Sequence, residues 1–262
     1  MRRLALTVAL LVFPALGFAQ APQLVTSGQL TWGMTPTFPP FEYMKNDKAV
    51  GFDVDLVAAI AAQMKLQSSP TQIAFTGLIP ALEGKRIDLI VSGMYINPQR
   101  TQVIDMIPYA YVGNQVVVRR GNPKHITGKD DLCGRAVAAP VGTVFETSAK
   151  QASATCKAAG KPEINLLSLT GTVYCALALT QGRADAIIVS TPVVGALETD
   201  TPGAYETAGA PWDATTEMGI GVRKDNTGLK DAVDKALKAI VADGNYAALI
   251  KKWNLPPGSS AF

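Results

Sequence analysis

Residues 78–100 read LIPALEGKRIDLIVSGMYINPQR and join a helical pattern to a strand and to the start of a second helix. Leu78 to Glu83 has helical character, and the apolar run from Ile87 to Val91 is typical of a buried strand. Pro98 suits the first turn of a helix. This alternation predicts an α/β fold in which helices cover both faces of a mainly parallel sheet.

The same alternation continues on both sides of this stretch. Strands are predicted over residues 29–33, 73–75, 136–139, 164–167, 184–189 and 217–222. Helices are predicted over residues 53–65, 143–158, 172–179, 229–241 and 246–253. Two runs of the pattern followed by a strand-helix-helix tail predict two lobes, and a single large sheet is the alternative. Two facing lobes would form a cleft that closes by hinge motion.

The N-terminus resembles a secretory signal peptide. Arg2 and Arg3 precede an apolar run from Leu4 to Phe13, and small residues lead to a predicted cleavage site after Ala19. The run is shorter than the ~20 residues that span a bilayer, which disfavours the alternative of a signal anchor. We therefore expect residues 1–19 to be removed from an exported, soluble chain.

Charge and composition exclude several function classes. Loss of Arg2 and Arg3 lowers the formal charge from +3 to +1, so the mature chain carries no basic surplus for nucleic acid or an anionic membrane. A single histidine, His125, limits most hydrolytic schemes, and no zinc spacing or phosphate-binding loop occurs. We expect a monomer without a metal or cofactor.

Arg100 stands beyond the carboxyl end of a predicted strand, where open α/β sheets bind ligands. Its planar guanidinium matches a carboxylate in two hydrogen bonds. Gly93 would let a ligand approach the backbone. The alternative is a solvated arginine on a helix surface.

Support for an anion site comes from Val141 to Val144, where Gly142 and Thr143 open a helix. Free backbone N–H groups, the helix dipole and the hydroxyl of Thr143 would favour an anion there. An ordinary N-cap role for Thr143 is the alternative, and both roles can hold together.

Aromatic residues in turn-rich segments suggest cleft walls. Phe38 and Phe75 are the better candidates, whereas Trp32 and Phe41 are expected in the core. In the segment GFDVDL, Asp53 or Asp55 is expected to cap a helix rather than to act as a general acid.

Three cysteines occur in a chain that is expected to be exported. Cys133 and Cys156 flank one predicted strand-helix unit, which favours a disulfide between them. Cys175 lies inside a helical pattern and is expected to be buried as a small apolar residue. Three reduced thiols remain the alternative, because spacing does not fix pairing.

Several motifs together resemble the periplasmic solute-binding proteins of polar amino-acid ABC importers. The motifs are FPPFEY (38–43), VGFDVDL (50–56), the stretch from Phe75 to Arg100, GTVFE, GRADA, MGIGVRK and DGNYAALIKKW. They cover essentially the whole mature chain in order. Relatives also pair cysteines placed like Cys133 and Cys156.

This resemblance implies the two-lobed periplasmic-binding-protein type II fold, with two hinge strands between the lobes. It implies a first lobe of residues 24–111 and 216–262, and a second lobe of residues 112–215. Residues placed like Arg100 and Thr143 bind the ligand α-carboxylate from opposite lobes, and Gly93, Phe38 and Phe75 enclose the ligand.

Three positions depart from the family pattern. Ser190 stands where the family places the aspartate that binds the ligand ammonium. Thr35 replaces another aspartate of members that bind polar or basic amino acids, and Tyr95 replaces a small hydroxyl residue. We therefore expect a cleft with one guanidinium and no facing carboxylate, which disfavours standard α-amino acids because an unpaired buried ion is costly. Quaternary or delocalised cations could still contact the aromatic rings.

The resemblance predicts a non-enzymatic binding component that delivers a small carboxylate-bearing solute to a membrane ABC permease. Amino-acid derivatives, betaine-like zwitterions and organic acids are admissible, and a sensing role would use the same residues. The alternative is a cleft enzyme similar to cyclohexadienyl dehydratase, for which the sequence offers no obvious general acid. Ser190→Asp is expected to raise affinity for common α-amino acids.

Overall fold

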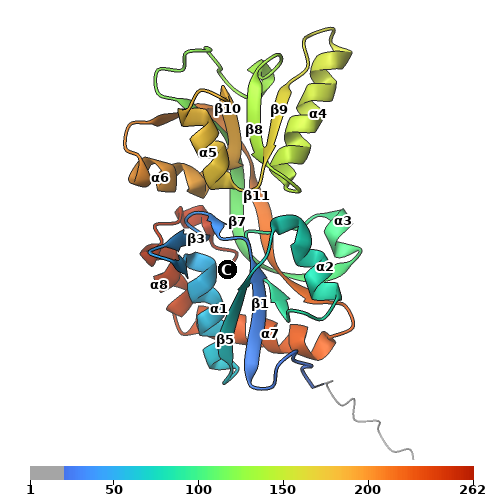
Figure 1. The fold of residues 1–262 in the computed structure, drawn as a ribbon. Coiled ribbons are helices and arrows are strands. Elements are labelled where there is room, and N and C mark those ends of the chain that lie inside the picture. Colours follow the sequence, from blue (N-terminus) through green and yellow to red (C-terminus); the bar gives the residue numbers. More distant parts are fainter. Residues whose placement is uncertain (1–20) are drawn as a thin grey trace, which may run out of the picture.

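The computed structural model describes residues 21–262, which form two α/β lobes stacked end to end (Figure 1). One eight-stranded sheet runs through both lobes in the order β5-β1-β6-β11-β7-β10-β8-β9. The predicted signal peptide lies outside the described residues. Among residues 21–262, no helix combines the length and apolar character that a membrane span requires.

The first lobe contains the N-terminal parallel strands and the C-terminal helices. Its strands are β1 (Gln29–Met34), β5 (Gln67–Gln72) and β6 (Leu89–Ile90), and its small antiparallel sheet comprises β2 (Thr37–Phe38), β3 (Glu42–Lys45) and β4 (Lys48–Val50). Its helices are α1 (Phe52–Gln63), α2 (Leu78–Glu83), α3 (Pro98–Thr101), α7 (Thr227–Ala242) and α8 (Asn245–Lys252). Helices α1, α7 and α8 pack together, while α2 covers a separate apolar cluster that includes Leu78, Leu82 and Ile90. Helices therefore cover both faces of the part of the large sheet that lies in this lobe.

The second lobe repeats the plan with parallel strands and three helices. Its strands are β8 (Ala136–Pro140), β9 (Asn165–Leu169) and β10 (Ala186–Ser190). Its helices are α4 (Val144–Ala158), α5 (Thr172–Thr180) and α6 (Thr191–Asp200). The two lobes thus share one architecture, as the sequence predicts.

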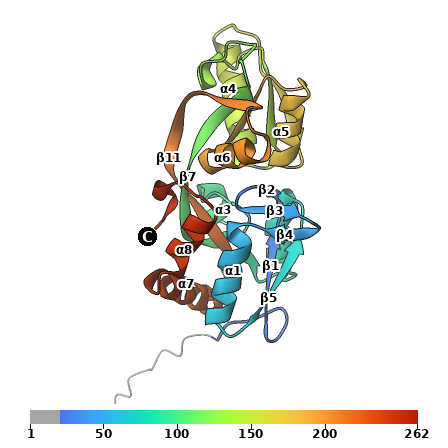
Figure 2. The same ribbon diagram turned by 90° about the vertical axis from the view of Figure 1, so that its left-hand side faces the viewer.

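Two long antiparallel strands carry the chain between the lobes (Figures 1 and 2). They are β7 (Ile104–Arg119) and β11 (Tyr205–Arg223). Their pairing is irregular between Ala208 and Thr216, where the register shifts on both sides of Trp212. A further shift lies between Met218 and Gly219. Such irregularities bend a strand and increase its local twist.

The strand predicted over residues 73–75 is wrong. The strand beside β1 is Gln67–Gln72, and Phe75–Gly77 forms a 3-10 turn instead. β5 is an edge strand made of polar and small residues, so apolar patterning does not mark it. The apolar side chain of Ile73 packs under α2 from beyond the strand end.

The expected disulfide and core residues are confirmed. Cys133 is bonded to Cys156, and Cys175 is a buried free thiol. Burial raises the pKa of Cys175 to about 12, so this thiol stays protonated at neutral pH. Trp32 and Phe41 are fully buried, as predicted.

Candidate functional site

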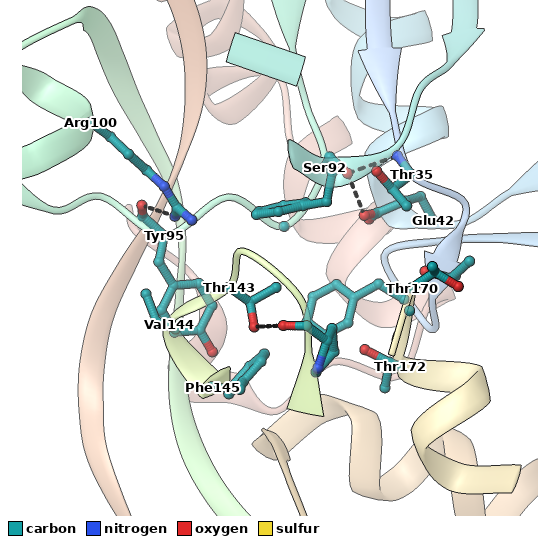
Figure 3. A pocket seen from close by; sticks show the side chains of 16 residues that line it. Thr35, Glu42, Ser92, Tyr95, Arg100, Thr143, Val144, Phe145, Thr170 and Thr172 are labelled. Carbon is teal, nitrogen blue, oxygen red and sulfur yellow. Dashed lines mark hydrogen bonds between the residues drawn. The ribbon is translucent and has the colours of Figure 1, made fainter. Parts of the chain in front are cut away.

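A pocket lies between the lobes and is lined by both of them. The residues from the first lobe are Thr35, Thr37, Phe38, Glu42, Phe75, Ser92, Gly93, Tyr95 and Arg100. Those from the second lobe are Pro140, Thr143, Val144, Phe145, Thr170, Gly171 and Thr172. We call this space the interlobe pocket. Figure 3 shows Arg100 on one side of it and Glu42 with Ser92 on the other.

Arg100 is held at the pocket by the short helix α3. The Asn97 side chain accepts a hydrogen bond from the Arg100 backbone N–H (2.9 Å) at the N-cap of this helix. The guanidinium donates to the Tyr95 carbonyl (2.7 Å) and, across the cleft, to the Gly142 carbonyl (3.3 Å). It also lies 5.4 Å from the centre of the Phe75 ring. Burial lowers the pKa of Arg100 to about 10, which leaves it a cation at neutral pH.

Thr143 faces the pocket from the N-cap of α4. Its hydroxyl accepts a hydrogen bond from the Glu146 N–H (3.4 Å) and donates to the Pro140 carbonyl (2.6 Å). The Gly142 N–H donates to the Glu146 side chain (3.0 Å). The expected anion site is therefore partly occupied by a carboxylate of the helix itself, while Thr143 both caps the helix and lines the pocket.

Aromatic rings form the walls. Phe38, Phe75 and Tyr95 line the pocket where the sequence predicts them, and Phe145 from the second lobe joins them. The Tyr95 ring meets Phe145 edge to face at 5.5 Å between centroids. Sequence analysis missed Phe145, although it lies two residues after Thr143 in the segment GTVFE.

Position 93 requires glycine for two reasons, its backbone conformation and its close contact with Phe38. Its φ is +51°, and an added Cβ would lie 2.5 Å from the Phe38 ring. Its N–H donates to the Asp53 side chain (3.0 Å). Gly93 thus lets the aromatic wall pack closely, and its N–H is already engaged.

A carboxyl group lines the pocket, contrary to the sequence-based expectation. Glu42 is 1% exposed, and its Oε1 accepts a hydrogen bond from the Ser92 hydroxyl (2.9 Å). The Ser92 oxygen in turn accepts from the Thr35 N–H (2.9 Å), and the Thr35 hydroxyl donates to the Ile73 carbonyl (2.7 Å). Thr35 therefore lines the pocket within a network that ends at Glu42. The available signal was a glutamate enclosed by aromatic residues in FPPFEY.

The prediction that Asp53 or Asp55 caps α1 is wrong, although both lie in its first turn, where a carboxylate complements the helix dipole. The N-cap is Gly51, without a side-chain hydrogen bond. Asp53 accepts hydrogen bonds from the Gly93 N–H and from the Tyr109 hydroxyl (2.9 Å). Asp55 pairs with Lys252 and accepts from the Trp253 indole. Both side chains bind partners that lie far away in the sequence, which helix spacing does not reveal.

Ser190 is not among the residues that line the interlobe pocket. It ends β10, is fully buried, and its hydroxyl has no hydrogen-bond partner. It lies close enough to the Tyr95 hydroxyl to influence it, and burial raises the pKa of that phenol. The Tyr95 hydroxyl donates to the Asn114 side chain (3.4 Å). The roles of Ser190 and of the pocket residues toward a ligand stay predictions.

Known proteins resemble the chain over most of its length. The sequence profile of the bacterial extracellular solute-binding proteins, family 3, matches residues 30–256. The ABC transporter arginine-binding protein 1 of Escherichia coli is 30% identical over 229 residues, which cover 86% of this chain and 90% of that protein. The L-cystine-binding protein TcyJ of the same species is 30% identical over 228 residues, with 86% and 82% covered.

A solved structure agrees with these sequence relatives. An ancestral arginine-binding protein bound to arginine superposes with a TM-score of 0.79 at 31% identity, over 86% of this chain and 98% of that one. These relatives are named as binding proteins and not as enzymes. The chain belongs to the bacterial extracellular solute-binding proteins, family 3.

Proposed function

We propose that this protein is the exported substrate-binding component of an ABC importer and that it clamps a small carboxylate-bearing solute of the amino-acid type between its lobes. Family membership supports the binding role, and relatives named for arginine and cystine support the ligand class. The residues predicted from the sequence, apart from Ser190, meet in one pocket.

The observation that supports this proposal most directly concerns the partners of the Arg100 guanidinium. Within residues 21–262, no carboxylate forms an ion pair with its guanidinium, which binds only backbone carbonyls. A half-buried guanidinium such as that of Arg100 gains most from a carboxylate that accepts two hydrogen bonds. A ligand carboxylate that reaches Arg100 and Thr143 together would bridge the two lobes.

A ligand that bridges the two lobes would explain how the protein closes on it. The lobes, proposed as residues 24–111 with 216–262 and residues 112–215, would close over the ligand by bending at the crossing strands. A ligand that contacts both lobes binds the closed form better than the open form and shifts the population toward it. The closed form would then deliver the solute to a membrane ABC permease, with the mature protein in the periplasm after removal of residues 1–19.

A thermal-shift screen of the mature protein tests the function. Amino acids, betaines and organic acids are added separately, since a ligand that binds only the folded state raises the melting temperature. We expect stabilisation by one or more solutes that carry a free carboxylate, and none by the corresponding amides. No stabilisation by any carboxylate would contradict the proposal. The cleft enzyme is not proposed, because the matched relatives are binding proteins.

A further inference from the structure

Two buried carboxyl groups lie together beneath one side of the interlobe pocket. Glu42 is 1% exposed and Asp53 is fully buried. Each has one oxygen that accepts hydrogen bonds, from Ser92 for Glu42 and from Gly93 and Tyr109 for Asp53. The other oxygen of each, Oε2 of Glu42 and Oδ1 of Asp53, has no partner. The Asp53 N–H donates to the carbonyl of Phe41 (2.9 Å), the residue before Glu42, and the two carboxyl groups bind Ser92 and Gly93, which are consecutive residues. The two side chains therefore lie side by side.

We propose that Glu42 and Asp53 share one proton in the ligand-free protein, and that a cationic group of the solute replaces this proton when it binds at Glu42. The inference rests on the proposed function and deepens it, because it assigns a guanidinium or ammonium group to the side of the pocket that faces Arg100. The displaced proton passes to water and buffer.

The surroundings of the pair support a shared proton. Two adjacent carboxylates in a dry site cannot both stay ionised at low cost, and one proton between them supplies a hydrogen bond to both. Burial raises the pKa of Glu42 well above its usual range, and burial also raises the pKa of Asp53 to about 6.

The other titratable groups near the pair are phenols. They are Tyr109 on β7 and Tyr246 on α8, and burial raises the pKa of both. Within residues 21–262, no basic side chain forms an ion pair with Glu42 or Asp53. A cationic group of a bound ligand would therefore supply the counter-ion that these two carboxyl groups lack.

The pocket geometry selects the class of this cation. Glu42 lines the pocket and Asp53 does not, so an incoming group meets Glu42 first. Arg100 would hold the solute carboxylate on the opposite side, and aromatic rings from both lobes line the same pocket. This arrangement fits a zwitterion or a cationic amino acid. In such a solute an apolar or aliphatic body would separate the carboxylate at Arg100 from the cationic group at Glu42.

Calorimetry with L-arginine and L-citrulline tests the exchange, because the two probes have nearly the same shape and differ in the charge of the end group. Binding is measured at one pH in two buffers of different ionisation enthalpy, which counts the protons released. We expect the protein to release close to one proton when it binds arginine, and none when it binds citrulline. The affinity for arginine should rise about tenfold per pH unit while the carboxyl pair is protonated. Glu42→Gln should abolish the release, and Asp55→Asn, on the same helix but paired with Lys252, should leave it intact.

Carbon-13 NMR of the carboxyl groups in the ligand-free protein provides a second test that needs no ligand. A carboxyl signal that titrates above the usual glutamate range, and is lost in Glu42→Gln, supports the shared proton, whereas its absence overturns it. Arginine binding without proton release also overturns the proposal, as does failure to bind arginine in a protein that other carboxylates stabilise. Failure of every carboxylate would instead contradict the proposed function.

Discussion

At the scale of single residues, the site depends on charges that have incomplete partners in the protein itself. Arg100 binds two carbonyl oxygens and no carboxylate, and the Glu42–Asp53 pair has no basic partner among residues 21–262. A carbonyl is a weaker partner for a guanidinium than a carboxylate is. The free protein therefore keeps buried charges that a ligand with opposite charges would compensate.

Arg100→Ala is expected to weaken binding of any ligand found in the screen by at least ~2 kcal/mol, because a charge-paired contact is lost. Arg100→Lys should recover part of this loss, since an ammonium keeps the charge but not the planar fork. Calorimetry measures both. Arg120→Ala, which removes a solvent-exposed arginine near Glu198, is the control. An unchanged affinity in Arg100→Ala would refute the carboxylate assignment.

Sequence analysis found the residues whose neighbours in the chain determine their position. Arg100 follows a strand and Thr143 opens a helix, so the local pattern placed both at the carboxyl ends of strands. Glu42 was missed and Asp53 was predicted only as a helix cap, because their contacts with Ser92, Gly93 and Tyr109 are not local. Contacts between residues 40 or more positions apart leave no local pattern.

At the scale of elements, apolar patterning predicted the amphipathic helices and the interior strands other than β7, which the sequence analysis did not list as a strand. It failed for β5, which lies at the sheet edge, and it did not identify the small β2–β4 sheet or α6. Patterning also predicted only the last part of β11, because the segment around Trp212 is polar and lies at the irregular crossing between the lobes. Patterning reports burial, so elements with exposed faces are harder to predict.

The disulfide joins the beginning of the β8 strand-helix unit to its end. The bonded cysteines are 23 residues apart, and a loop of that size restricts the unfolded chain by about 3 kcal/mol in the chain-entropy model. The double variant Cys133→Ala and Cys156→Ala should therefore unfold at lower denaturant concentration. Cys175→Ala is not a suitable control, since it creates a cavity in the core. Reduction of the wild-type protein is the matched comparison, and equal stability before and after reduction would contradict the prediction.

At the scale of the whole molecule, the lobes touch each other across the pocket. Arg100 reaches the Gly142 carbonyl, and the rings of Tyr95 and Phe145 meet edge to face. Gly171 also lies against Thr37, because an added Cβ on Gly171 would be 2.2 Å from the Thr37 hydroxyl oxygen and 2.5 Å from its Cβ. The lobes are thus in contact across the pocket, and the absence of a side chain at Gly171 permits this approach.

Gly171→Ala is expected to oppose closure without unfolding either lobe, because the new methyl group meets Thr37 only when the lobes are together. Affinity should fall about tenfold or more if closure carries 1.4 kcal/mol or more of the binding free energy. Small-angle X-ray scattering should show that the ligand compacts the wild-type protein and compacts the variant less. Gly195→Ala is the control, since a Cβ at that position in α6 meets nothing within 4 Å. A Gly171→Ala protein that binds and compacts like the control would show that close approach at Thr37 is not needed, and that the lobes hold the ligand in a wider arrangement.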